Sequence, residues 1–308
     1  MIRAFAIVLM GVTLASCDVE LLPTPAGHSQ TIELEEIAAE GLPDQRVTVW
    51  LPPEYEEDAE RRFPVLYMWD GQNLLDPAQT HYGKAWMIQD VMKDLVAAGE
   101  AEPHIVVGIW SPDGMDRYRV YVPQFVGDAD GKIADNVAEM AGGPVASQRQ
   151  LDWVADDLTT RIDSQYRTIA DPEARTIAGA SMGGVMSCFA IIERPDVFDR
   201  AGCISAHFAL VAPEIVDGDA AQVERLWDEY LTAKLGAPDG RRVWMDHGTV
   251  GLDGYYAPWQ EAVAADFRRL GWQEGEDFTA RVYEGAEHDE IAWSRRMPEV
   301  LRWLWRDE

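Results

Sequence analysis

The sequence predicts an α/β fold, with a mostly parallel central sheet and helices on both of its faces. Segments typical of strands alternate with segments of helical periodicity along most of the 308 residues, and this alternation is typical of parallel sheets. The length and the hydrophobic content of 47% are sufficient for the core of one large domain or of two small ones. A Gly-x-Ser-x-Gly motif at residues 179–183 stands between a strand segment and a helix segment.

Period-two alternation predicts the first strands, and continuous apolar runs predict strands that are buried on both faces. We expect strands at residues 31–37, 46–51, 63–69, 103–110, 174–179, 201–205, 242–245 and 278–283. Apolar residues at helical spacing predict helices at residues 84–98, 151–165, 184–193, 258–270 and 291–305. Two segments interrupt this rhythm, at residues 111–147 and 213–238. They are expected to form either a rim over a site at the carboxyl ends of the strands or plain surface loops.

The N-terminus is predicted to lie outside the fold, as a signal peptide over residues 1–16 with one arginine, a short apolar core and small residues. Leu14-Ala-Ser-Cys17 resembles a bacterial lipobox, which would make Cys17 the lipidated N-terminus, and an ordinary secretory signal is the alternative. Residues 17–29 are then a flexible spacer and residues 30–308 a single domain. Either signal predicts an exported protein. The lipobox predicts a periplasmic or cell-envelope lipoprotein of a Gram-negative bacterium, attached to the membrane only by its anchor.

The charge of the chain limits its partners. There are 26 Lys and Arg residues against 54 Asp and Glu residues, a formal net charge of −28. Such a surface repels phosphate backbones, so we expect no nucleic-acid partner. Cys188 and Cys203 lie in apolar segments and are predicted to be buried free thiols. No metal site or cofactor is expected.

Ser181, at the centre of the Gly-x-Ser-x-Gly motif, is the candidate nucleophile. The motif is typical of a sharp turn from a strand into a helix, with the serine at its apex. Its glycines allow the strand and the helix to approach closely. Here a β-branched segment precedes the motif and an apolar segment follows it, stopped by Pro195. A glycine-rich loop that happens to hold a serine is the alternative.

A nucleophilic serine needs a base, and the base needs an acid that orients it. Of the histidines after Ser181, His288 follows the last predicted strand and precedes the terminal helix, a position from which an imidazole can reach a central serine. His207 and His247 lie at or near other strand ends and are interpreted as structural, with a place in the lining of the site as the alternative. For the acid, Asp253 lies in a loop that can turn toward His288, and we prefer it to Asp246, which falls on a strand end.

The remaining candidates surround the nucleophile. An oxyanion hole is expected from the backbone N–H of Met182 and a second N–H from Gly71 or Gln72, in the loop after the third strand. A plain strand–helix turn is the alternative there. Four aromatic residues near strand ends are candidates for a substrate pocket, with core packing as the alternative. They are Trp69, Trp110, Tyr118 and Tyr255.

Five segments in order along the chain resemble one branch of the α/β-hydrolases. They are residues 67–77, 162–168, 178–184, 246–253 and 284–293. This branch includes enterochelin-esterase-like enzymes, the S-formylglutathione hydrolases known as esterase D, and feruloyl and acetyl-xylan esterases. Trp69 departs from the branch, because many of its members have histidine there.

The resemblance implies an α/β-hydrolase fold and hydrolysis of carboxylic esters through Ser181, His288 and Asp253, with an acyl-enzyme intermediate and no cofactor. The substrate would be a small-molecule ester with a small acyl, carbohydrate-linked, aromatic or siderophore group. An acyltransferase that uses the same triad and a non-catalytic binding lipoprotein are the alternatives. The natural ester and the oligomeric state are not predicted.

Overall fold

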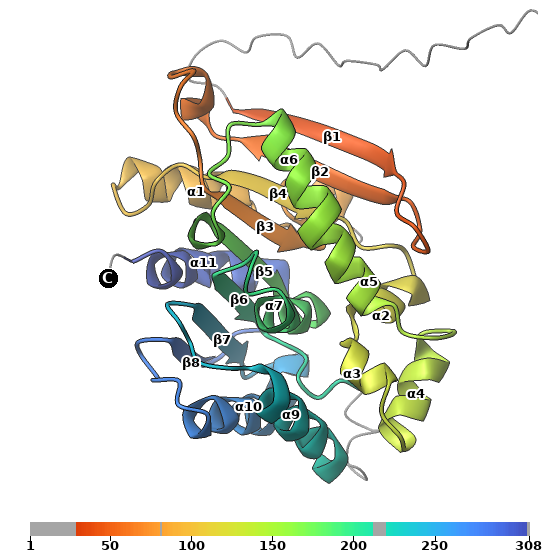
Figure 1. Cartoon of the computed structure of the whole chain (residues 1–308). Coiled ribbons are helices and arrows are strands. Elements are labelled where there is room, and N and C mark those ends of the chain that lie inside the picture. Colours follow the sequence, from red (N-terminus) through yellow and green to blue (C-terminus); the bar gives the residue numbers. More distant parts are fainter. Residues whose placement is uncertain (1–28, 81, 212–219, 307–308) are drawn as a thin grey trace, which may run out of the picture.

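The computed structural model describes residues 29–80, 82–211 and 220–306. In these residues, eight strands form one sheet in the order β1-β2-β4-β3-β5-β6-β7-β8 (Figure 1). Their bounds are β1 Gln30–Ile37, β2 Gln45–Leu51, β3 Val65–Trp69, β4 Ile105–Ile109, β5 Arg175–Ala180, β6 Arg200–Ile204, β7 Arg242–Gly248 and β8 Phe278–Tyr283. β2 is antiparallel to β1 and β4, and every pairing from β4 to β8 is parallel. The predicted mostly parallel sheet is confirmed.

Helices cover both faces of the sheet (Figure 1). Their bounds are α1 Ile88–Ala97, α2 Met115–Tyr121, α3 Gln124–Gly127, α4 Lys132–Met140, α5 Ser147–Asp152, α6 Thr159–Gln165, α7 Met182–Glu193, α9 Ala220–Lys234, α10 Ala257–Arg269 and α11 Glu290–Leu304. A π-helical stretch, Trp153–Leu158, joins α5 to α6. Side chains of α1 and α11 share one hydrophobic cluster, whereas those of α7, α9 and α10 belong to the cluster on the opposite face.

Strand β3 shows why the central strands are apolar at every position. Val65 and Tyr67 contribute to the core under α7, while Leu66 and Met68 contribute to the core under α1 and α11. Successive side chains of a strand point to opposite faces, so a sheet with helices on both sides needs apolar residues at odd and even positions alike. All five residues of β3 are buried.

The interruptions in the predicted rhythm contain helices. Residues 111–147 form α2, α3 and α4, and α9 occupies most of the described part of residues 213–238. The expected helix at residues 84–98 begins only at Ile88, because the preceding residue, Met87, has φ 50° and breaks the helical conformation.

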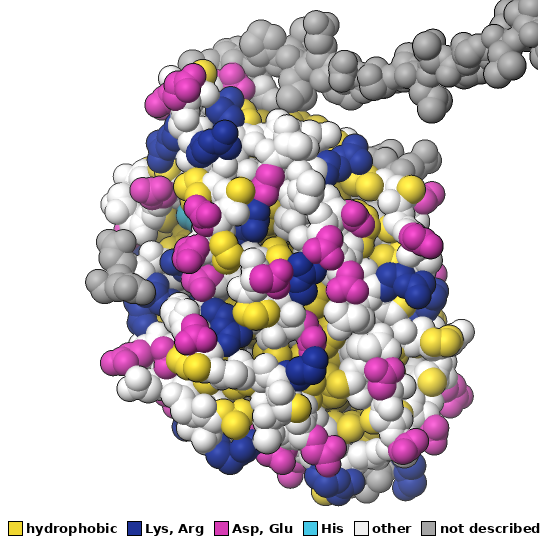
Figure 2. Space-filling model, in the orientation of Figure 1, with side chains coloured by type: hydrophobic (Ala, Val, Ile, Leu, Met, Phe, Trp, Pro, Cys, Tyr) yellow, Lys and Arg dark blue, Asp and Glu magenta, His cyan; other side chains and the backbone are white. Residues whose placement is uncertain are grey.

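Acidic and basic side chains are mixed over the face shown in Figure 2 and do not separate into patches of one sign.

The predicted signal peptide, the lipidation at Cys17 and nearly all of the predicted spacer lie outside the described residues. In the part of the chain that is described, the structure has no helix long and apolar enough to cross a bilayer. The division into signal, spacer and single domain stays a prediction.

The contact between β5 and α7 depends on a glycine. A Cβ on Gly179 would lie 2.8 Å from the carbonyl carbon of Gly183, closer than atoms of a strand and a helix can pack. We expect Gly179→Ala to lower the free energy of unfolding by roughly 1–3 kcal/mol, the usual cost of overpacking, as measured by urea denaturation. Gly202→Ala is the control, because its new methyl would lie no closer than 3.1 Å to any neighbour, the nearest being the side chains of Ala178 at 3.1 Å and Ile204 at 3.4 Å. Equal effects of the two substitutions would contradict this account.

Candidate active site

Ser181 lies at the apex of a sharp turn between β5 and α7. Its φ of 58° and ψ of −121° are a strained conformation for a residue with a side chain. Two backbone hydrogen bonds hold the turn: the Ser181 N–H donates to the Ile204 carbonyl, and the His207 N–H donates to the Ser181 carbonyl, both at 3.1 Å. The structure therefore has the strand, turn and helix that the motif predicts.

His288 and Asp253 are in direct contact. His288, in the loop between β8 and α11, donates from Nδ1 to Oδ1 of Asp253 at 2.6 Å. The other carboxylate oxygen, Oδ2, accepts from Ser205 Oγ and from the Gly248 N–H, each at 2.6 Å. Because an ionised carboxylate can only accept, the proton of a neutral His288 resides on Nδ1, which leaves Nε2 as a base.

Asp253 is fully buried yet remains a carboxylate. Burial opposes its ionisation, but the hydrogen bonds from His288, Ser205 and Gly248 outweigh burial and hold the pKa of Asp253 below its usual value. An ionised Asp253 can stabilise the imidazolium that forms when His288 accepts a proton.

The Asp246 carboxylate makes its hydrogen bonds with residues other than His288. Its Oδ1 accepts from Arg296 Nη2 at 2.7 Å and from the Ser205 N–H at 2.9 Å, and its Oδ2 accepts from Trp244 Nε1 at 2.7 Å. Both members of the Asp246–Arg296 pair are buried. The structure places Asp253, and not Asp246, against the imidazole of His288.

The Ser205 hydroxyl connects this ion pair to the acid. Trp293 Nε1 donates to Ser205 Oγ at 3.0 Å, and Arg296 Nη2 donates to it at 2.6 Å. Both are donors only, so the single proton of the hydroxyl is directed to Asp253. Ser205, Trp293 and Arg296 were not among the candidates from the sequence. A signal existed for Arg296, which is a cation on the apolar face of the terminal helix, close to Trp293 and Met297.

The loop after β3 contributes Gln72 to the cavity that Ser181 also lines. Gly71 is packed so closely against β4 that a Cβ there would lie 2.5 Å from the carbonyl carbon of Gly108. The side chain of Gln72 is fixed by Ser111, donating to its Oγ at 2.6 Å and accepting from its N–H at 3.1 Å. Met182 is the first residue of α7, so its N–H has no acceptor within the helix.

A cavity of about 670 Å³ opens at Ser181 and His288. Its aromatic lining residues, apart from His288, are Trp69, Tyr82, Trp86 and Trp293, and the rings of Trp86 and Trp293 lie 5.4 Å apart. Of the other candidates from the sequence, Gln72 lines the cavity, whereas Trp110, Tyr118 and Tyr255 are not among its lining residues. Trp110 instead donates from its indole to Thr48 at 2.8 Å. Tyr255 is 58% exposed.

The two cationic residues of the cavity are already paired. Arg117 makes a bidentate contact with Asp70, at 2.7 and 2.8 Å. Lys84 Nζ lies 2.6 Å from Asp289. Neither cation is therefore free to bind a strongly anionic substrate without breaking an ion pair.

His207, interpreted from the sequence as structural, lies next to the site. Its Nδ1 is 2.7 Å from the Tyr256 hydroxyl, and the Tyr256 ring meets the edges of both His207 and His288. Burial, followed by the nearby His288, lowers the pKa of His207 to about 4. His207 is therefore neutral at physiological pH.

No cluster of three or more His, Cys, Asp or Glu side chains is placed to hold a metal ion within the described ranges. Cys188 and Cys203 are buried free thiols, as predicted.

Comparison with known proteins identifies the family. A sequence model of the family described as "Putative esterase" matches residues 43–304. The chain belongs to this esterase family. The match covers β2 to α11 and includes Ser181, Asp253 and His288, which agrees with the resemblance seen in the sequence.

Individual relatives are distant. An endo-1,4-beta-xylanase/feruloyl esterase of Xylanibacter ruminicola is 28% identical over 85% of this chain and 29% of its own length. The uncharacterized protein YbbA of Bacillus subtilis is 25% identical over 54% of this chain and 58% of its own length. The chain therefore spans less than two thirds of either relative.

Among solved structures, an IroE-like serine hydrolase from Shewanella oneidensis superimposes with a TM-score of 0.64, at 18% identity. The alignment covers 89% of this chain and 79% of that one. This likeness supports the α/β-hydrolase fold.

Loss of the Ser205 hydroxyl is expected to impair turnover without loss of substrate binding. Ser205→Ala removes one hydrogen bond to Asp253 and leaves the donors of Trp293 and Arg296 without that acceptor, a cost of about 1–3 kcal/mol. For a soluble ester we expect kcat to fall about ten- to hundredfold with KM nearly unchanged. Ser187→Ala is the control, because this buried serine of α7 donates to Gly183 and does not touch the triad. Equal kcat values for the two variants would contradict a positioning role for Ser205.

The buried histidines make stability depend on pH. Burial lowers the pKa of His207 to about 4 and that of His104 to about 3. In an unfolded chain the pKa of histidine is about 6.5, so as the pH falls these residues bind protons in the unfolded chain before they do so in the folded one. Their contribution is fully present above about pH 6.5 and is lost as the pH falls toward 4. The free energy of unfolding therefore falls between pH 7 and pH 4.5. We expect His207→Gln and His104→Gln each to make this fall smaller by on the order of 3 kcal/mol, as measured by urea denaturation. Variants that keep the full slope of the wild type would refute the assignment.

Proposed function

We propose that this protein is a serine hydrolase of carboxylic esters, with Ser181 as nucleophile, His288 as base and Asp253 as the orienting acid. The observation that carries the proposal is the 2.6 Å contact between His288 and the buried Asp253, beside a serine held at a strained turn in the same cavity. This arrangement has the parts that activate a serine hydroxyl. Membership of the esterase family supports it.

The reaction would proceed in two acyl-transfer steps. His288 Nε2 takes the Ser181 proton as Oγ attacks the ester carbonyl, and the backbone N–H groups of Met182 and of Gly71 or Gln72 stabilise the oxyanion. His288 then returns the proton to the departing alcohol, which leaves an acyl group on Ser181. Water attacks this acyl-enzyme with His288 again as base, and the acid is released as Ser181 recovers its proton.

We propose an aromatic acyl group on the substrate. Three tryptophans, Trp69, Trp86 and Trp293, are among the residues that line the cavity and favour a planar ring. The ion pairs of Arg117 and Lys84 disfavour a highly anionic siderophore ester. The relative from Xylanibacter ruminicola, whose name includes feruloyl esterase, is consistent with this class.

An acyltransferase would use the same triad. Product analysis in the presence of added alcohols tests whether the acyl group is transferred to an acceptor other than water.

Substitution of the triad tests the assignment directly. Ser181→Ala is expected to lower the hydrolysis of p-nitrophenyl acetate by about a thousandfold or more, with the thermal unfolding transition retained. Labelling by a phosphonate should likewise be lost. A variant that keeps most of its turnover would refute Ser181 as nucleophile.

The two aspartates provide the matched comparison in the same experiment. Asp253→Asn should lower kcat by at least about a hundredfold, because the amide no longer stabilises the imidazolium. Asp246→Asn should instead lower the free energy of unfolding by about 3–5 kcal/mol, since it leaves the buried Arg296 cation without its partner. The opposite pattern would exchange the roles of the two residues.

A further inference from the structure

The side chain of Tyr256 has no role in the chemistry described so far, although it lies against the nucleophile. It is buried, and its hydroxyl is hydrogen-bonded to Ser181 and lies 2.7 Å from Nδ1 of His207. Tyr256 is not among the residues that line the catalytic cavity. Its hydroxyl therefore reaches Ser181 from the protein interior, and not from the cavity that a substrate would occupy.

The backbone holds both Tyr256 and His207 close to the triad. The Tyr256 N–H donates to the Asp253 carbonyl at 3.0 Å, so Tyr256 follows directly on the short helical turn that contains the candidate acid. The His207 N–H donates to the Ser181 carbonyl at 3.1 Å, which attaches His207 to the elbow. The contact between the two side chains thus links the nucleophile turn to the loop of the acid.

The Tyr256 hydroxyl is available as a hydrogen-bond donor. Burial, with a smaller contribution from the Asp253 carboxylate, raises the pKa of Tyr256 above its usual value, so the phenol keeps its proton at neutral pH. A phenol has one proton to donate. Two neighbouring atoms can accept it, Nδ1 of His207 and Oγ of Ser181.

The charge on Oγ decides which neighbour accepts this proton during the reaction. In the proposed mechanism Oγ forms a bond with the ester carbonyl carbon while its own proton passes to Nε2 of His288, so negative charge develops on Oγ. Hydrogen bonds to charged acceptors are stronger than those to neutral ones, and Oγ then becomes the better acceptor. The hydroxyl of Tyr256 can turn toward it without movement of the ring, and its proton is not transferred.

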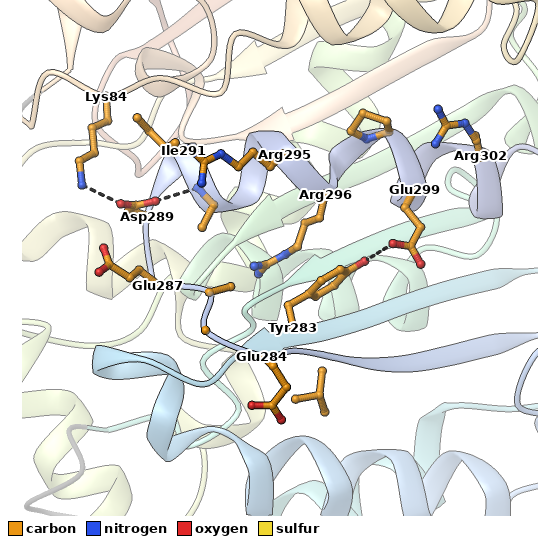
Figure 3. Close-up of a pocket in the computed structure, with 15 residues that line it drawn as sticks. Lys84, Tyr283, Glu284, Glu287, Asp289, Ile291, Arg295, Arg296, Glu299 and Arg302 are labelled. Carbon is orange, nitrogen blue, oxygen red and sulfur yellow. Dashed lines mark hydrogen bonds and ion pairs between the residues drawn. The ribbon is translucent and has the colours of Figure 1, made fainter.

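The imidazole of His288 is held independently of this hydroxyl. Its Nδ1 is bonded to the acid, and the next residue, Asp289, caps α11 and forms an ion pair with Lys84 (Figure 3). The Tyr256 ring meets the imidazole edge-on, with ring centroids 5.5 Å apart. Tyr256→Phe would keep this ring contact and remove only the hydroxyl. Its effect on turnover would therefore not arise from a displaced base.

We propose that Tyr256 is a further catalytic residue, which donates a hydrogen bond to Oγ of Ser181 as that oxygen loses its proton, and that His207 positions the phenol for this role. The proposal rests on the proposed ester hydrolysis at Ser181. The same hydrogen bond acts again when the acyl-enzyme breaks down, because Oγ then takes the electron pair of the bond to the acyl carbon and recovers its proton from His288. The backbone N–H groups of the oxyanion hole act on a different oxygen, that of the carbonyl.

Tyr256→Phe tests the proposal through two rates that depend on charge at Oγ. We expect kcat for p-nitrophenyl acetate and the rate of phosphonate labelling each to fall about ten- to hundredfold, with KM within about twofold and the thermal unfolding transition retained. Tyr67→Phe is the matched control, because the hydroxyl of this buried tyrosine has no hydrogen-bond partner among the described residues. It should leave both rates within about twofold of the wild type.

A double-substitution cycle tests the positioning role of His207. His207→Gln alone should lower kcat about five- to tenfold, but less than about twofold when Tyr256→Phe is already present, because the hydroxyl that it positions is then absent. Wild-type or faster rates for Tyr256→Phe, an equal loss for Tyr67→Phe, or additive effects in the cycle would overturn the proposal. A wild-type protein without any turnover or labelling that depends on Ser181 would instead refute the proposed ester hydrolysis, and this role of Tyr256 with it.

Discussion

The hydroxyl of Ser205 is the contact on which the arrangement of the candidate triad depends. It has one proton and two acceptor sites, and Asp253, Trp293 and Arg296 use all of them. These partners come from the loop after β7 and from α11, so a single buried atom fixes the acid relative to the helix that follows His288. Trp293 also packs its ring 5.0 Å from the imidazole. Any displacement of α11 would therefore reach both members of the Asp253–His288 pair.

The strain at Ser181 is maintained by the packing around it. The residue keeps a positive φ because the residues before it form β5, inside the sheet, and the residues after it form a fully buried stretch of α7. A local change of conformation would have to separate β5 from its neighbours β3 and β6. The packed core thus stabilises a backbone conformation that an isolated peptide would not keep.

Much of the fold could be predicted from the sequence, because the strands and helices differ in hydrophobic period and the elbow has a residue pattern of its own. The contact of Asp253 with His288 was also expected, since Asp253 lies in a loop that can turn toward His288 whereas Asp246 falls on a strand end. The roles of Ser205 and Arg296 could not be predicted, because they depend on which side chains meet across β6, β7 and α11. The same holds for Trp110 and Tyr255, whose positions near strand ends do not specify the direction in which each ring points.

The direction of β1 has a consequence for how the molecule would face its surroundings. β1 and β4 run the same way, because each is antiparallel to β2. Gln30 therefore lies at the amino-terminal end of the parallel strands, whereas Ser181 and His288 follow their carboxyl ends. If Cys17 carries the lipid that we propose from the sequence, the domain would be attached by the pole opposite its catalytic cavity.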